Sequence, residues 1–232
     1  MEEILRGGFA QLGLELPAAA LAGFRAYFDA LEAGNRVMNL TAITGEADTA
    51  RLHFLDCAAV LAAAELWDKR VIDVGTGAGF PGLVLKIAEP SIRLTLLDSL
   101  NKRVEFLRRT CAALDLGDVT CLHRRAEEAP ELREQFDFAV SRAVARLNVL
   151  CELCLPFVKV GGSFLAMKGP GAAEELREAE RAITLLGGEF VAAHRYAVPG
   201  TELRHCVLEI CKTAPTPAQY PRRFAKIQKQ PL

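Results

Sequence analysis

The strongest constraint on the fold is a change in the pattern of apolar residues near residue 70. From Arg70 to about Lys212, short β-rich apolar runs alternate with helical patterns. This alternation predicts right-handed βαβ units around a buried, mainly parallel sheet. The strand candidates are almost continuously apolar, as expected when both faces of a sheet are covered. They are RVIDVGTG, RLTLLD, DVTCLHR, FDFAVSRA and GSFLAMKG.

The alternation ends before the chain does. After a charged helical segment, the runs EFVAAHRYAVP and ELRHCVLEICK follow one another, with Pro199-Gly200 at their junction and no helix between them. They should therefore pair as an antiparallel hairpin. A doubly wound sheet that finishes in a hairpin is the layout of class I methyltransferases, whereas dinucleotide dehydrogenases usually continue the βαβ pattern.

The two ends of the chain do not show this alternation of strands and helices. Residues 1 to about 65 contain two long helical patterns joined by the loop NLTAIT, and Gly34-Asn35 is the predicted stop of the first. After Lys212, three prolines in APTPAQYP oppose regular structure. We therefore expect a helical cap (1–67), an α/β core (68–213) and a basic tail (214–232).

Composition and cysteine usage limit the classes of protein. The 232 residues are 51% hydrophobic, which is enough for a hydrophobic core that needs no disulfide bonds or structural metal ions. No apolar run approaches the roughly 20 residues of a membrane span, and the N-terminus is acidic, unlike a signal peptide. We expect a cytoplasmic protein that does not contact a membrane. Cys151 and Cys154 have CxxC spacing in an apolar helix without a second Cys/His pair, so we predict packing rather than a metal site.

The net charge of −1 hides an asymmetry. Five of the 28 Lys and Arg residues lie between Lys212 and Leu232, where there are no acids, so the remaining 211 residues carry 23 basic against 29 acidic groups. A basic tail on an acidic body is typical of an arm that contacts phosphates, and a frayed, solvated terminus is the alternative. The candidate RNA-binding residues of the tail are Arg222, Arg223, Lys226 and Lys229.

The clearest chemical motif is VIDVGTGAGFPG (71–82), in which a strand runs into a glycine-rich turn and then a helix. Glycines permit the turn and let the backbone approach a ligand, which is a nucleotide, flavin or sulfonium cofactor. Asp73 is placed to hold the turn or the cofactor's ammonium group. Asp98 ends the next strand, where a carboxylate accepts ribose hydroxyls; its alternative role is a helix cap. The candidate cofactor residues are Asp73, Gly75, Gly77, Gly79 and Asp98.

Two further turns should lie at the same edge of the sheet. The third strand ends in RRAEE, so Ala126 and Glu127 are candidates for the adenine edge. The fourth strand ends at Ser141 and Arg142. A charged side chain there is costly unless it is paired, so we assign Arg142 to the cofactor carboxylate or to an RNA phosphate.

The missing motifs also carry information. The fourth strand does not end in the Asn/Asp-Pro-Pro-aromatic sequence used for exocyclic amines, and no Pro-Cys nucleophile for cytosine C5 is present. Guanine N7 has a free lone pair and no proton to remove, so its methylation requires alignment and charge dispersal but no general base. The sequence is consistent with that chemistry. His53 and Asp56 share a helix face, which by spacing alone is a capping or surface polar pair.

These motifs together resemble the bacterial RsmG (GidB) family of 16S ribosomal RNA guanine-N7 methyltransferases. The matches, in order, are NLTAI (39–43), HFLD (53–56), DVGTGAGFPG (73–82), LLDSLNKRVEFL (96–107), RAEE (125–128), SRAVA (141–145) and KVGGSFLAMKG (159–169). They are spread over about nine-tenths of the chain. One departure is Cys57, which stands where the family usually has serine.

The resemblance implies a class I fold with an N-terminal helical cap, S-adenosylmethionine as methyl donor, and a guanosine in the decoding-region loop of 16S RNA as acceptor. By matching position it adds cofactor contacts at Gly75, Phe80, Asp98, Ala126, Glu127 and Arg142. It places His53, Asp56 and Lys168 on the substrate side, where His53, Asp56 and Arg142 are the catalytic candidates and Lys168 an RNA contact. The acidic body leads us to expect a small ribosomal subunit, mature or assembling, as a better partner than naked 16S RNA.

Three other functions share parts of this pattern. A methyltransferase of a small molecule or protein would have the same cofactor half. A dinucleotide-dependent oxidoreductase would use the glycine-rich turn for a different nucleotide. A non-catalytic RNA-binding module would bind RNA without S-adenosylmethionine. Titration with the two cofactors and deletion of the tail distinguish these alternatives.

Overall fold

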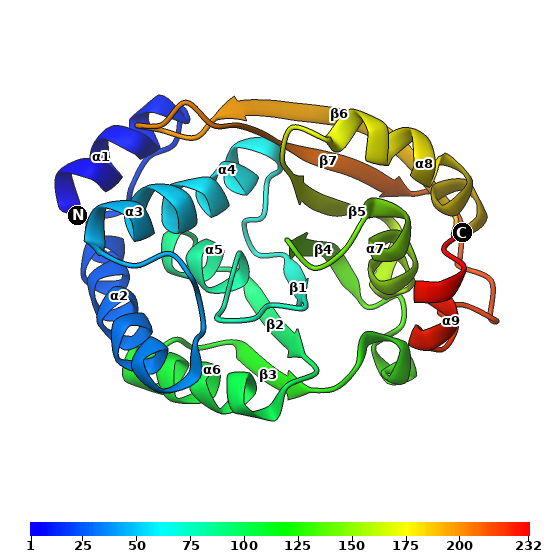
Figure 1. Ribbon diagram of the computed structural model, residues 1–232, viewed down its shortest axis with the longest axis horizontal. Helices are drawn as coiled ribbons and strands as arrows, with labels where there is room; N and C mark the ends of the chain where they lie inside the picture. The colour runs from blue at the N-terminus through cyan, green and yellow to red at the C-terminus, as the bar shows by residue number, and fades with distance from the viewer.

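The computed structural model describes residues 1–232 and contains one seven-stranded sheet with helices on both faces (Figure 1). The strand order is β3-β2-β1-β4-β5-β7-β6. Strands β1 to β5 run parallel, and β7 pairs antiparallel with both β5 and β6. The predicted doubly wound sheet with a terminal hairpin is confirmed. The strands are β1 (Arg70–Val74), β2 (Arg93–Asp98), β3 (Val119–His123), β4 (Phe136–Arg142), β5 (Val158–Lys168), β6 (Gly188–Ala197) and β7 (Arg204–Lys212).

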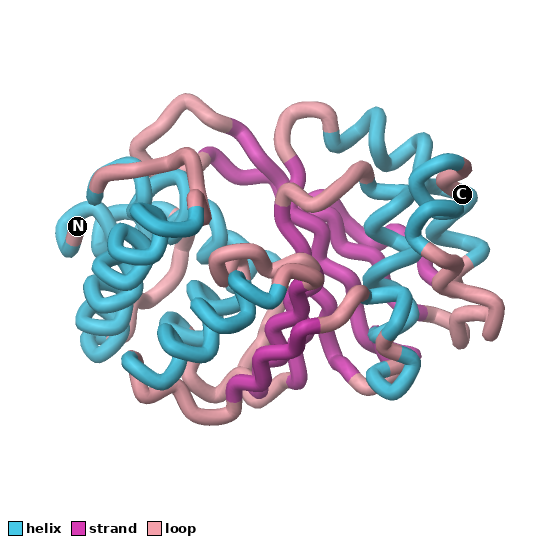
Figure 2. The backbone as a smooth tube through the Cα atoms, turned by 60° about the horizontal axis from the view of Figure 1, so that its bottom comes forward, coloured by secondary structure: helices cyan, strands magenta, loops and turns pink.

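The sheet separates two layers of helices, which Figure 1 and Figure 2 show to its left and right. The N-terminal helices, α5 and α6 share one hydrophobic cluster, and α7, α8 and α9 share the other. The helices are α1 (Glu2–Gln11), α2 (Ala18–Met38), α3 (Glu46–Thr49), α4 (Asp56–Ala63), α5 (Gly82–Ala88), α6 (Asn101–Ala113), α7 (Leu147–Cys154), α8 (Ala172–Leu185) and α9 (Phe224–Lys229). A π-helical segment, Ala50–Leu55, joins α3 to α4.

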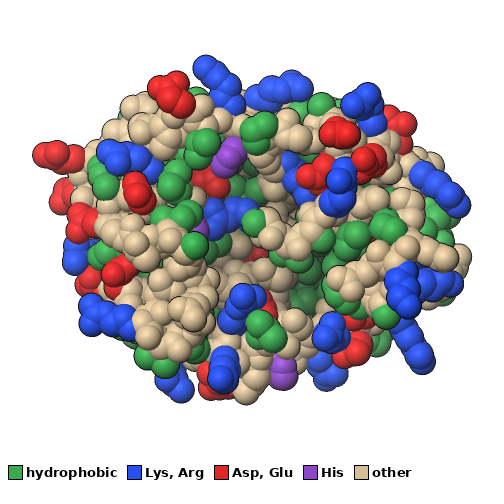
Figure 3. All heavy atoms as spheres, in the orientation of Figure 1, with side chains coloured by type: hydrophobic (Ala, Val, Ile, Leu, Met, Phe, Trp, Pro, Cys, Tyr) green, Lys and Arg blue, Asp and Glu red, His purple; other side chains and the backbone are tan.

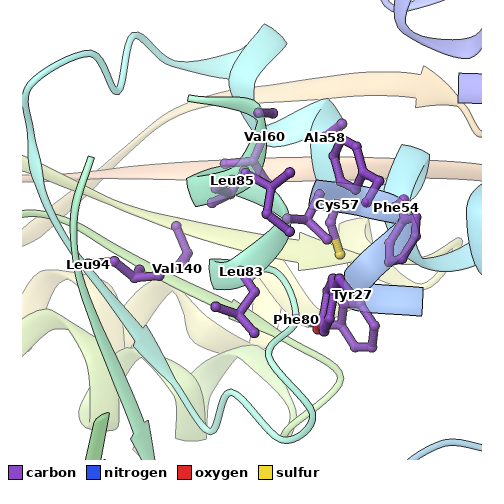
Figure 4. Close-up of a cluster of buried hydrophobic side chains, with 14 of the residues drawn as sticks. Tyr27, Phe54, Cys57, Ala58, Val60, Phe80, Leu83, Leu85, Leu94 and Val140 are labelled. Atoms are coloured by element: carbon purple, nitrogen blue, oxygen red, sulfur yellow. The ribbon is translucent and has the colours of Figure 1, made fainter. Parts of the chain in front are cut away.

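The N-terminal helices pack directly on the sheet. Figure 4 shows Tyr27 of α2 and Phe54 of the π-helical segment beside Phe80 of the glycine-rich turn and Leu83 of α5. Tyr27 stacks on Phe54 with ring centroids 5.4 Å apart, and its hydroxyl donates to the Ala78 carbonyl over 2.8 Å. Residues 1–67 therefore have no separate core, and their helices brace the turn after β1.

One predicted helix end is wrong. The helix does not stop at Gly34-Asn35; α2 continues to Met38 and ends at Asn39, whose φ of 49° is left-handed. A Cβ at Gly34 would lie 2.8 Å from both Leu40 Cδ1 and Phe106 Cε2. Gly34 therefore allows close packing inside the helix. The predicted loop over 39–44 is free of helix and strand.

The tail is part of the second core. Ile227 of α9 is buried, and Phe224 and Tyr220 pack against the same cluster. The Lys212 side chain is completely buried, and its Nζ donates to the Leu155 carbonyl (2.7 Å) and to the Thr216 hydroxyl (2.6 Å). The frayed-terminus alternative and the counting of Lys212 as a surface cation are therefore both wrong.

Two features of composition have structural counterparts. Cys151 and Cys154 are buried on α7, as the apolar surroundings of the CxxC segment predicted. None of the helices is both long enough and apolar enough to cross a bilayer.

Candidate active site

The reversal of strand order between β1 and β4 places the predicted site at the carboxyl edge of the sheet. β1 pairs with β2 on one side and with β4 on the other, so the turns after these strands lie side by side. In open α/β sheets such a switch point forms a crevice for ligands. The turn after β1 carries Gly75, Gly77 and Gly79, all at positive φ.

Asp73 holds this turn from below. Its Oδ2 accepts from the Thr76 hydroxyl and from the Gly82 N–H, each over 2.7 Å. Its Oδ1 is buried without a partner. Burial raises the pKa of Asp73 to about 7, against the opposing effect of the two hydrogen bonds. The carboxyl group therefore organises the turn, which is one of the two roles predicted for it.

Asp98, at the end of β2, faces the turn. Its Oδ2 accepts from the Gly77 N–H over 2.9 Å, and its Oδ1 accepts from the Leu100 N–H over 2.8 Å. The second bond forms a turn two residues long just before α6, which begins without a side-chain cap, so the helix-capping alternative is wrong. A carboxylate accepts about four hydrogen bonds in all, so acceptor sites remain for a ligand.

The glycine turn and Asp98 line a cavity of about 390 Å³, which we call the glycine-turn cavity. This volume lies within the range of small-molecule sites, roughly 300 to 1,000 Å³. A Cβ at Gly75 would lie 2.6 Å from Val144 Cγ2, so a side chain there would press on the wall after β4. The other wall residues are Leu40, Thr41, His53, Thr76, Gly77, Ala78, Phe80, Ser99, Arg103, Arg142 and Ala143.

Arg142, at the end of β4, lies at the centre of a buried polar network. Its Nη1 donates to Asp56 Oδ2 (3.1 Å) and to the Leu52 carbonyl (3.0 Å). Its Nη2 donates to His53 Nδ1 over 2.7 Å. The guanidinium also stacks over the Phe80 ring, 4.8 Å from its centroid. Within the chain, Arg142 therefore pairs with residues of the helical cap, and its predicted contact with a cofactor carboxylate or an RNA phosphate stays a prediction.

The bond from Arg142 fixes the protonation of His53. Because a guanidinium only donates, Nδ1 must accept, and the imidazole is neutral with its proton on Nε2. Nε2 lies 2.8 Å from the Thr41 hydroxyl and donates to it. Burial and the nearby Arg142 lower the pKa of His53 to about 3. Both ring nitrogens are therefore engaged, and the surface-pair alternative for His53 and Asp56 is wrong because both side chains are buried.

Asp56 connects this network to the hairpin. Its Oδ1 accepts from the Tyr196 hydroxyl and from His205 Nδ1, each over 2.8 Å. Burial raises the pKa of Asp56, but its hydrogen bonds to His205 and Tyr196 and the Arg142 charge outweigh this and keep that pKa below its usual value. The hydrogen bond to Asp56 raises the pKa of His205. Sequence reasoning missed Tyr196 and His205, since no local pattern links these two hairpin residues to the cap.

A second cavity, of about 660 Å³, lies between the cap and the hairpin, and we call it the hairpin cavity. It shares His53, Arg142, Ala143 and Val144 with the glycine-turn cavity. Figure 3 shows this face hollowed near its centre, with basic and acidic side chains on both sides of the hollow. Its other wall residues are Ile43, Leu52, Asp56, Ala145, Arg146, Met167, Lys168, Gly169, Glu175, Tyr196, Val198, Leu203 and His205.

Some predicted residues lie away from both cavities. Ala126 and Glu127 line a separate pocket beside Tyr220, although their turn begins next to Asp98, whose carbonyl accepts from the Arg124 N–H over 3.1 Å, so their contact with the adenine stays a prediction. Arg222 forms a bidentate ion pair with the buried Glu152, with nitrogen–oxygen distances of 2.8 and 2.6 Å. Arg222 therefore neutralises a buried carboxylate.

The remaining basic candidates differ in accessibility. Arg223, Lys226 and Lys229 are exposed on the tail, on the side of the sheet opposite the cap (Figure 1). The Lys168 side chain is almost buried in the wall of the hairpin cavity. Their contacts with RNA remain predictions.

The fold and the site define a class I methyltransferase: a doubly wound sheet ending in a hairpin, a glycine-rich turn after β1 and a carboxylate at the end of β2. Solved structures agree with this fold. A SAM-dependent methyltransferase from Aquifex aeolicus aligns with a TM-score of 0.54 at 19% identity, over 71% of this chain and 93% of that one. TrmN from Thermus thermophilus aligns with a TM-score of 0.55 at 20% identity, over 68% of this chain and 48% of that one.

Sequence comparison identifies the family. The model of GidB, rRNA small subunit methyltransferase G, matches residues 20–203. Ribosomal RNA small subunit methyltransferase G of Alkaliphilus oremlandii is 48% identical, over 100% of this chain and 99% of the relative. Its counterpart in Clostridium perfringens is 42% identical, over 99% and 98%. The chain belongs to the rRNA small subunit methyltransferase G family, so the oxidoreductase and non-catalytic alternatives are wrong.

The glycine-turn cavity fits S-adenosylmethionine, the methyl donor of this class. The cofactor has a cationic sulfonium, an ammonium group and two ribose hydroxyls, all of which a carboxylate attracts or accepts from. Asp98 supplies such a carboxylate in the cavity wall. The unpartnered Asp73 Oδ1 adds negative potential beneath the turn when that group is ionised.

Proposed function

We propose that the chain transfers a methyl group from S-adenosylmethionine to N7 of a guanosine in the decoding-region loop of 16S ribosomal RNA. Asp98, Gly75 and Gly77 line the glycine-turn cavity and hold the methyl donor there, whereas Gly79 faces Tyr27 and Leu83. The target base enters the hairpin cavity. The methyl group crosses where the two cavities share His53, Arg142, Ala143 and Val144.

One observation supports N7 over other acceptor atoms: the junction offers no available general base. His53 Nδ1 accepts from Arg142, and Nε2 is protonated and directed at Thr41. Asp56 already accepts from Arg142, Tyr196 and His205. An exocyclic amine must lose a proton during methylation, whereas N7 attacks through a free lone pair. The protein's contribution is then alignment and electrostatics.

We further propose that Arg142, His53 and Asp56 act as a rigid unit that sets the shape of this junction. The guanidinium is held by two side chains, a carbonyl and the Phe80 ring, so it cannot swing into either cavity. Phe80 lines the glycine-turn cavity and supports His53, whose ring is 4.1 Å away and nearly parallel. Preorganised geometry of this kind lowers the barrier because less motion has to be frozen during reaction.

For the substrate, we propose a small ribosomal subunit, mature or assembling, in the cytoplasm. The base must be unstacked and turned out of its RNA before it can enter the cavity. Exposed basic residues, including Arg223, Lys226 and Lys229, contact phosphates. The acidic remainder of the surface opposes binding to RNA in general.

The test is a methyl-transfer assay with labelled S-adenosylmethionine. Small subunits, naked 16S RNA and an unrelated RNA, all from cells lacking the enzyme, are incubated separately with the purified protein. We expect label in 16S RNA, with subunits the best substrate. Binding of S-adenosylmethionine without transfer to any of the three would instead support the small-molecule or protein alternative.

A further inference from the structure

The hairpin cavity contains two carboxylates, and only Glu175 has an oxygen without a hydrogen bond in the chain. Asp56 uses both of its oxygens within the buried network. Glu175, in the first turn of α8, accepts from the Leu147 N–H (2.7 Å) and from Lys168 Nζ (2.8 Å), both through Oε2. Its side chain is 23% exposed and lines the cavity, so Oε1 is available to a ligand.

Lys168 places a hydrogen-bond donor beside this acceptor. Its Nζ donates to Glu175 and to the Ala145 carbonyl, the latter over 2.7 Å, so one of its three N–H groups is uncommitted. The side chain is 7% exposed, at the end of β5 in the cavity wall. Such a buried ammonium does not reach a phosphate on the outer surface. The wall therefore presents a donor and an acceptor next to each other.

That pair matches one edge of guanine. The Watson–Crick edge of guanine presents the O6 acceptor beside two donors, N1–H and the 2-amino group. Adenine presents a donor at C6 and an acceptor at N1, which is the reverse order. Enzymes that extrude a base read this edge by hydrogen bonds. A site built to make such bonds rejects the mismatched base because its buried polar groups are left unpaired.

We propose that Lys168 donates to O6 of the target guanine and that Glu175 accepts from N1–H and the 2-amino group. This inference rests on the proposed function and specifies how the enzyme recognises the base that accepts the methyl group. It assigns Lys168 to the base instead of the RNA backbone. The apolar walls, among them Ile43, Val144 and Leu203, then cover the faces of the ring.

The same contact favours the reaction itself. The N7 lone pair forms the new bond to the methyl carbon, while the carbon–sulfur bond breaks and its electron pair returns to sulfur. No proton leaves, and the guanine ring gains the positive charge that sulfur loses. N1–H becomes more acidic as this charge develops, so its bond to Glu175 strengthens toward the transition state. Interactions of that kind raise kcat.

The first test compares Glu175→Gln with Glu174→Gln. Both residues lie in the first turn of α8, but Glu174 is exposed and does not line the cavity. Both variants lose the same charge near the helix N-terminus. Glu175→Gln should lower kcat/KM for small subunits by about 10- to 100-fold, the value of a hydrogen bond to a charged group. Its Kd for S-adenosylmethionine should be unchanged, and Glu174→Gln should match the wild type.

The second test separates recognition from a structural role of the Lys168–Glu175 pair. Subunits are rebuilt with inosine, which lacks only the 2-amino group, at the guanosine that the wild-type enzyme methylates. Inosine should lower kcat/KM for the wild type, and clearly less for Glu175→Gln. Equal losses in both enzymes would overturn the inference, because independent effects add. Failure of the wild type to label 16S RNA at all would instead refute the proposed function.

Discussion

Replacing Arg142 by methionine tests the buried network most severely, because the variant keeps the apolar stem of the side chain and loses the guanidinium with its charge and its hydrogen bonds. The Arg142 side chain is 15% exposed, and that of its partner Asp56 is 6% exposed. Removing one member of a buried ion pair costs about 3–5 kcal/mol. Asp56 keeps its bonds from Tyr196 and His205, so we expect the lower end, about 3 kcal/mol.

For a chain of this length each kcal/mol lowers Tm by roughly 2–4 °C, so Arg142→Met should unfold about 6–12 °C below the wild type. The assay is thermal unfolding followed by circular dichroism, with methyl transfer measured at 25 °C, where both proteins are folded. Transfer should be lost, because the guanidinium shapes the junction of the two cavities.

Two controls accompany this variant. Arg142→Lys keeps the charge but not the forked geometry, so it should recover part of the stability and little of the activity. The double variant with Asp56→Asn should be less unstable than the two single changes added together, since each removes the other's unpaired charge. Additive losses, or a Tm for Arg142→Met within about 2 °C of the wild type, would show that the ion pair does not hold the cap to β4.

Three further predictions follow from other parts of the site. The pKa of His53 in the folded chain is about 3, below the roughly 6.5 of an unfolded histidine, so the unfolded state binds the extra proton between these values. The free energy of unfolding of the wild type, measured by urea titration, should therefore fall relative to that of His53→Gln as the pH decreases from about 6.5 toward 3. A difference between the two proteins that does not change with pH would contradict the neutral imidazole. In Gly75→Ala the added Cβ lies against Val144 Cγ2, on a backbone with φ +72° that alanine rarely adopts. Calorimetry should therefore show the Kd for S-adenosylmethionine rising about tenfold or more. An unchanged Kd would mean that the turn does not contact the cofactor. Neutralising Arg223, Lys226 and Lys229 together should weaken 16S RNA binding and reduce the slope of log K against log salt by about two; an unchanged slope would mean that the tail does not contact phosphates.

The sheet and the cofactor turn are predictable from the sequence because their signals are local. Alternating apolar strands and helices fix the topology, and the glycines after β1 and Asp98 after β2 mark the edge where ligands bind. Arg142 is predictable for a related reason: a charge directly after an apolar strand needs a partner. All of these features are readable within a few residues.

The polar network is not predictable in this way. His53 and Arg142 are 89 residues apart, and Asp56 and His205 are 149 apart, so no local pattern links them. Charge counting along the tail ignored burial, and it therefore treated Lys212, which is buried inside the protein, as a surface cation. Gly34 was misread for a similar reason, since a glycine that permits close packing and one that ends a helix look the same in sequence.

The chemical identity of the methylated nucleoside tests the proposed transfer to N7 directly. Small subunits from cells lacking the enzyme are labelled with the purified protein, and their 16S RNA is digested to nucleosides and mapped by cleavage at the modified base. We expect 7-methylguanosine at one position in the decoding-region loop. Label in a base methylated on an exocyclic amine or on carbon would contradict it, since that chemistry needs a base that the junction of the two cavities does not provide.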